Sequence, residues 1–162
     1  MKYQVEITNL NNLINTKKGG KYLLGLLQNL YCSCQSEFSA FLLFNYQHLA
    51  IKKKNKKLSN LLKEFSNTCL YNSHILGELI IKQKGLPFYL NSQHSPLTAF
   101  WLNYEVDLKS LIKMDKSFLQ TLIDNYSIYI KKIDCKTVKT ILRKLQKQSV
   151  LMLETLNNFE IK

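Results

Sequence analysis

The chain has 162 residues and a mass of 19.0 kDa, a length that suits one domain with a buried core. Hydrophobic residues make up 46% and charged residues 21%, as in an ordinary globular protein, and no uninterrupted apolar run reaches the length of a membrane span. The net charge of +12 indicates attraction to anionic surfaces such as nucleic acid, membrane headgroups or acidic proteins.

The positive charge has two interpretations. Arg143 is the only arginine, and specific recognition of phosphates or bases usually relies on arginine. Lys, Asn, Ile and Tyr are abundant together, as an AT-rich genome would produce, so the charge can also be a matter of composition. The densest basic segment, "KKKNKK", is the candidate surface for an anionic partner, through Lys52, Lys53, Lys54, Lys56 and Lys57.

The four cysteines are expected to be reduced thiols. The N-terminus "MKYQVEITNL" lacks the apolar core of a signal peptide, so we expect a cytoplasmic protein with reduced thiols. Cys32 and Cys34 do not form a C-x-x-C motif, and no second pair completes a zinc site. We expect these two, together with Cys69 and Cys135, to be mainly small buried apolar residues.

Apolar residues spaced three and four apart predict two long helices in the first half of the chain. Residues 1–20, which end in "TKKGG", are expected to form a lead segment before a single helical domain over residues 21–162. The first helix is predicted over residues 21–51 and the second over residues 58–84. Gly85 follows as an expected C-cap glycine.

The second half of the chain predicts another pair of helices. Residues 85–105 hold both prolines and no sustained period, which indicates a long connection. A third helix is predicted over residues 106–133, and Asp134 is the expected N-cap of the fourth. Two antiparallel pairs joined by a long crossover describe an all-α, ferritin-like four-helix bundle.

We also expect a homo-oligomer, because such bundles commonly associate and the crossover is rich in aromatic residues: Phe88, Tyr89, Phe100 and Trp101.

The middle of the predicted bundle contains one carboxylate, Glu37, on the apolar stripe of the first helix. Ferritin-like di-metal proteins use a Glu from each of two helices and Glu-x-x-His from each of the other two. Two divalent cations need these hard carboxylates to offset their charge. At the depth of Glu37 the other stripes present Cys69, Asn72, Leu119, Ser149 and Met152.

Four segments resemble the rubrerythrin-like branch of the ferritin superfamily: "SEFSAFLLFNYQ", "HILGELIIKQKGLP", "LNYEVDLKSLI" and "IDNYSIYIKKIDCKTVKTILRKL". The resemblance covers about residues 22–159. It implies a di-iron or di-manganese site whose ligands fall on the same six positions, of which only Glu37 keeps the family's residue. A shift of one turn in the last two helices does not restore a site, since Glu154 has no histidine near it. We therefore expect no catalytic residue, no metal site and no cofactor.

Two other features allow a metal site. His74 and Glu78 lie four residues apart on one helix face, which predicts either a surface pair or a shallow metal or proton site, and we favour the surface pair. His48 and His94 have no liganding partner nearby in sequence. Cys69 and Glu37 could together hold a zinc ion weakly.

A buried carboxylate without a partner is costly, so Glu37 is expected to be neutral, hydrogen-bonded or open to water. The candidate partners in the core are Asn72, Tyr46, Tyr126 and Ser149.

Three functions compete. We favour a ferritin-like protein that has lost its di-metal site and acts as a structural or interaction protein rather than as an enzyme. The alternatives are an oxidoreductase of the rubrerythrin type with an altered site, and a basic module that binds nucleic acid or anionic surfaces.

Overall fold

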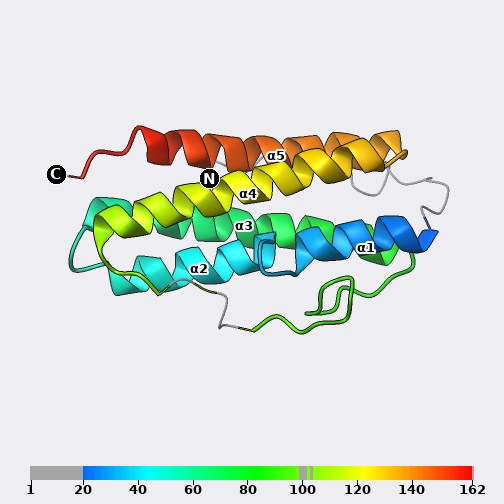
Figure 1. Ribbon diagram of the computed structural model, residues 1–162, viewed down its shortest axis with the longest axis horizontal. Helices are drawn as coiled ribbons and strands as arrows, with labels where there is room; N and C mark the ends of the chain where they lie inside the picture. Colours follow the sequence, from blue (N-terminus) through cyan, green and yellow to red (C-terminus); the bar gives the residue numbers. More distant parts are fainter. Residues whose placement is uncertain (1–19, 99–101, 103, 162) are drawn as a thin grey trace.

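The computed structural model describes residues 20–98, 102 and 104–161. The predicted lead segment lies outside them, except for Gly20, where the first helix begins. The helices are, in chain order, α1 (Gly20–Tyr31), α2 (Glu37–Ala50), α3 (Lys56–Lys82), α4 (Leu108–Lys132) and α5 (Lys136–Asn157). In Figure 1, α1 and α2 follow one another along the bundle beside α3, and α4 runs beside α5, so that five helices fill four positions.

The first helix position is interrupted, and the single helix predicted over residues 21–51 is wrong. Ser36 begins α2 as its N-cap: its hydroxyl accepts a hydrogen bond from the Ser39 backbone N–H at 3.2 Å and donates one to the Ser33 carbonyl at 2.9 Å. Serine side chains favour such local bonds over helix continuation. Because the helix is interrupted here, Cys34 is exposed, whereas the sequence analysis expected it to be buried.

The end of α3 differs from the expected glycine cap. Lys84, and not Gly85, takes the left-handed conformation, with φ of 63°. The N–H of Lys84 bonds to the Ile81 carbonyl and that of Gly85 to the Ile80 carbonyl, which together form a Schellman motif. Gly85 is needed for close packing instead, because a Cβ there would lie 2.7 Å from Cδ2 of Leu24.

The predicted crossover is confirmed, with the connection now running from the end of α3 to the start of α4. Asp107 caps α4 by accepting a hydrogen bond from the Ser110 N–H at 3.0 Å. The prediction that Asp134 caps the last helix is wrong. Cys135 occupies that position, and its side chain makes no capping hydrogen bond within the described chain.

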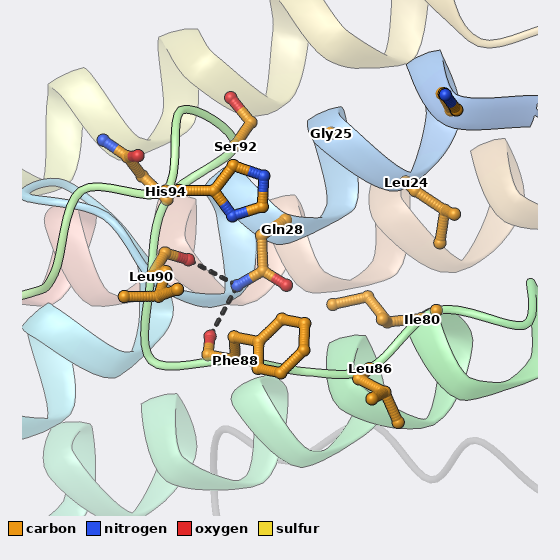
Figure 2. A pocket seen from close by; sticks show the side chains of 12 residues that line it. Leu24, Gly25, Gln28, Ile80, Leu86, Phe88, Leu90, Ser92 and His94 are labelled. Atoms are coloured by element: carbon orange, nitrogen blue, oxygen red, sulfur yellow. Dashed lines mark hydrogen bonds between the residues drawn. The ribbon is translucent and has the colours of Figure 1, made fainter.

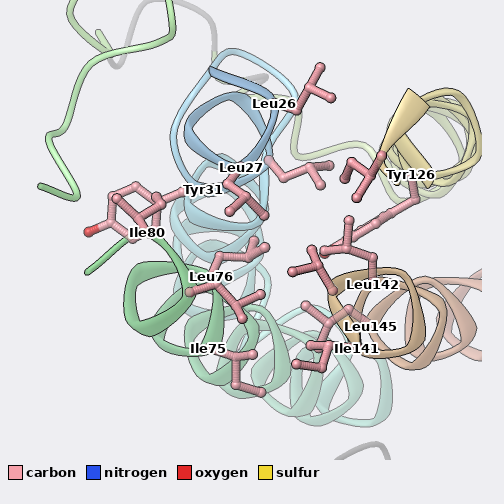
Figure 3. Close-up of a cluster of buried hydrophobic side chains, with 14 of the residues drawn as sticks. Leu26, Leu27, Tyr31, Ile75, Leu76, Ile80, Tyr126, Ile141, Leu142 and Leu145 are labelled. Carbon is pink, nitrogen blue, oxygen red and sulfur yellow. The ribbon is translucent and has the colours of Figure 1, made fainter. Parts of the chain in front are cut away.

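The core consists of two apolar clusters. One lies between α1 and the facing parts of α3, α4 and α5, where the side chains shown in Figure 3 point toward one another. The other is built around α2, the first half of α3, the first part of α4 and the end of α5. Tyr126 belongs to the first cluster and Cys69 to the second, so the polar layer around Glu37 lies where the two clusters meet. None of the described helices has the length and apolar character to cross a membrane.

Candidate buried polar site

Glu37 lies at the start of α2, directly after the helix break, and its side chain is fully buried. Its Oε1 accepts a hydrogen bond from the Tyr126 hydroxyl at 2.7 Å and another from Nδ2 of Asn72 at 3.2 Å. The expectation of a hydrogen-bonded Glu37 is therefore confirmed, with one partner from α3 and one from α4.

Within the described chain, neither of the other two candidate partners donates a hydrogen bond to Glu37. The Tyr46 hydroxyl donates to the Tyr104 carbonyl at 3.4 Å, away from the core. Ser149 is buried on α5, but its hydroxyl finds no hydrogen-bond partner among the described residues. Of the four candidate partners, the structure therefore selects Asn72 and Tyr126.

Burial dominates the electrostatics of this layer. It raises the pKa of Glu37 to about 7, although hydrogen bonds from Tyr126, Asn72 and Cys69 act in the opposite direction. Burial, followed by the proximity of Glu37, raises the pKa values of Cys69 and Tyr126 well above their ordinary ranges. At neutral pH the site therefore contains a thiol, a phenol and a carboxyl that is only partly ionised.

Two more of the positions that the resemblance implied as ligands contribute only packing. Leu119 and Met152 are completely buried in the same apolar cluster as Cys69. Of the six predicted positions, the structure brings Glu37, Cys69 and Asn72 into contact around one carboxyl, and it places Leu119 and Met152 in the apolar core. Nowhere in the described part of the chain do three or more His, Cys, Asp or Glu side chains gather as a metal site would require.

The histidines are dispersed. His48 is buried, and its Nδ1 lies 3.0 Å from the Ser59 carbonyl and 2.9 Å from the Ser59 hydroxyl, which joins α2 to α3. His74 and Glu78 are both exposed on α3, consistent with a surface pair. His94 lies in the crossover.

A second buried carboxyl, Asp115 on α4, was missed by the sequence analysis. Its Oδ1 accepts a hydrogen bond from Nε2 of Gln47 at 2.8 Å, and burial raises its pKa to about 7. The sequence does indicate its burial, because Asp115 lies three residues after Ile112 and four before Leu119, on the apolar face of the helix. We overlooked it because an aspartate is not expected on a buried face.

The basic segment between α2 and α3 is open to solvent. All five of its lysines are exposed. Nζ of Lys54 donates to the Val106 carbonyl at 3.3 Å, and the ammonium of Lys57 lies 5.3 Å from the centre of the Phe159 ring. The other three remain available for an anionic partner, which stays a prediction.

Comparison with solved structures identifies the fold. Two crystal structures of KatB, a manganese catalase from Anabaena, one of them from Anabaena PCC7120, each superimpose with a TM-score of 0.82 and 17% sequence identity. Each alignment covers 94% of this chain and 77% of the catalase chain. The chain has the all-α, ferritin-like fold of these proteins, which confirms the predicted fold class. No protein-family model and no curated protein sequence matches it.

Proposed function

We propose that this protein is a ferritin-like bundle without a working di-metal centre, which acts through its surface as a structural or interaction protein. Its place in the rubrerythrin-like branch belongs to the same proposal. The observation that carries it is the donor set around Glu37. The described residues supply a single carboxyl there, whose Oε1 accepts from Tyr126 and Asn72 while its Oε2 has no hydrogen-bond partner among them.

The donors around Glu37 do not fit two divalent cations. A di-metal site of this fold brings four carboxylates and two imidazoles. Here the matching positions bring one carboxyl, one thiol, one amide, one hydroxyl, one thioether and one isobutyl group. Two cations would keep a large uncompensated charge in the low-dielectric core.

Metal analysis of the purified protein tests the proposal. We expect manganese and iron far below one atom per chain, both as purified and after incubation with each metal followed by gel filtration. The melting temperature should not rise with manganese or iron, nor fall with a chelator. Glu37→Gln is the matched variant, because it keeps the shape of the side chain and removes the only carboxyl that the described residues bring to the layer.

Two results would contradict the proposal. Stoichiometric manganese or iron that stabilises the wild type but not Glu37→Gln would favour the oxidoreductase alternative, and peroxide decomposition could then be assayed directly. Zinc bound by the wild type and lost in both Glu37→Gln and Cys69→Ala would instead indicate the single-metal site.

A second candidate function, binding to a phosphate-bearing surface, is favoured by the exposure of all five lysines in the segment 52–57. Binding to duplex DNA and to vesicles containing anionic lipid would be measured at several salt concentrations. Affinity that falls with salt and is lost in Lys52→Glu/Lys53→Glu would support this function, because counterion release drives such binding. Affinity unchanged by these substitutions would exclude the segment as the binding surface.

A further inference from the structure

A cavity of about 380 Å³ lies between α1, the end of α3 and the first part of the crossover, and none of its lining residues belongs to the hydrogen-bonded group around Glu37 (Figure 2). Its apolar wall includes Leu24 from α1, Ile80 from α3, and Leu86 and Phe88 from the crossover. A volume of this size, mostly apolar with a few polar groups, is typical of a site for a small molecule.

The cavity is held open by hydrogen bonds between α1 and the crossover. Nε2 of Gln28 donates to the carbonyls of Phe88 and Leu90, each at 2.6 Å, and so uses both of its hydrogens (Figure 2). Oδ1 of Asn29 accepts from the Ser92 N–H at 2.8 Å. Because these bonds already fix the wall, a ligand would not have to order it on binding.

One rim residue, His94, has an unusual backbone conformation. Its φ of 60° is uncommon for any residue other than glycine. The turn around it is fixed by Asn91, whose Oδ1 accepts from the N–H groups of Gln93 and Ser95, each at 2.9 Å. Figure 2 shows the His94 ring beside Gln28 and Ser92 at the cavity. Backbone strain of this kind is concentrated at ligand sites.

The electrostatics of the rim favour an anion. Lys21 lies in the first turn of α1, where the helix dipole adds positive potential. None of the described residues that line the cavity is acidic. The net charge of +12 adds a long-range attraction for negative ligands.

We propose that this cavity binds an amphipathic carboxylate, with its apolar chain against Leu24, Ile80 and Phe88 and its carboxylate at Lys21. The inference is independent of the metal content of the core.

Calorimetric titration of the whole protein with decanoate tests the proposal. We expect saturable binding of one decanoate per chain, and binding of decylamine weaker by about tenfold or more because its head group has the opposite charge. Lys21→Glu should weaken decanoate binding by a similar factor. Lys63→Glu, the same charge change at an exposed site on α3, should leave it unchanged. Absence of decanoate binding, or equal binding of decylamine, would overturn the proposal.

A second pair of variants locates the ligand. Gly25→Leu should abolish decanoate binding by filling the cavity; a Cβ at this position meets only Cβ of Ser92, at 3.5 Å, so the helix itself tolerates it. Leu86→Glu, at a side chain that is 65% exposed, places a negative charge beside the ligand without disturbing the core, and should also abolish binding. Decanoate binding that survives in folded Leu86→Glu would place the ligand elsewhere and refute the assignment.

Discussion

Glu37 and Asp115 are two carboxyls without a cationic partner among the described residues, each in the core and each with its pKa raised by burial to about 7. Each is held by amide or hydroxyl donors from a neighbouring helix. Such groups stabilise the fold when protonated and cost free energy when ionised.

The first prediction concerns the pH dependence of stability. The folded pKa of Glu37 lies above its unfolded value of 4.5, so the folded protein binds more protons between these values. The contribution of Glu37 is therefore complete below pH 4.5 and is lost progressively as pH rises to about 7. Urea unfolding between pH 4 and pH 8 should show this loss in the wild type and a smaller one in Glu37→Gln, where Asp115 alone remains.

Exposed Glu78 on α3 provides the control. Glu78→Gln should leave the pH profile of the wild type unchanged. At pH 8, Glu37→Gln should be at least as stable as the wild type, because it no longer has to bury a charge. Identical pH profiles for the wild type and Glu37→Gln would show that Glu37 ionises normally in the folded protein.

The second prediction compares two glycines. Gly85→Ala should destabilise the protein by about 1–3 kcal/mol, because its Cβ would meet Leu24 at 2.7 Å and Ile80 at 3.0 Å. Gly25→Ala should stabilise it by up to about 1 kcal/mol, because the position is helical and its nearest contact, at 3.5 Å, is an ordinary one. Thermal unfolding measures both changes, and equal effects would mean that the crossover moves away from α1 at little cost.

At the scale of elements, periodicity predicts the helices well but does not locate their interruptions. The stripe before and after residues 32–36 stays apolar, so a continuous helix and two helices give nearly the same pattern. The Ser36 hydroxyl decides between them through its local hydrogen bonds. The position of Glu37 on the apolar stripe is enough to predict that its side chain is buried. Spacing does not predict which of the four candidate side chains hydrogen-bond to it, because that depends on the direction of each side chain.

The helix break leads to the third prediction. Ser36 is fully buried and caps α2, so Ser36→Ala should cost about 1–2 kcal/mol in the free energy of unfolding. Ser117→Ala, at an exposed position inside α4, is the matched control and should be neutral or slightly stabilising. A neutral Ser36→Ala would mean that packing alone separates α1 from α2.

At the scale of the whole molecule, the break and the polar layer coincide. Glu37 is the first residue of α2 and lies where the two apolar clusters meet, so the hydrogen bonds to Tyr126 and Asn72 join α2 to α4 and α3 at this boundary. Packing and the hydrogen bonds to this one buried carboxyl thus hold three helices together at the boundary between the clusters.

The last prediction is self-association through the surface that the end of α3 and the crossover share. Ile81, Leu86, Phe88 and Tyr89 are 51%, 65%, 48% and 60% exposed, while Phe100 and Trp101 lie outside the described residues. Large apolar side chains concentrated on one surface typically mark an interface. Sedimentation velocity should therefore show a dimer or larger species that dissociates on dilution, and Ile81→Glu should shift it toward monomer. Ile128→Glu, which adds the same charge at a 45% exposed position on α4, should not. A wild-type protein that sediments as a monomer at every concentration would contradict the prediction, as would equal effects of the two substitutions.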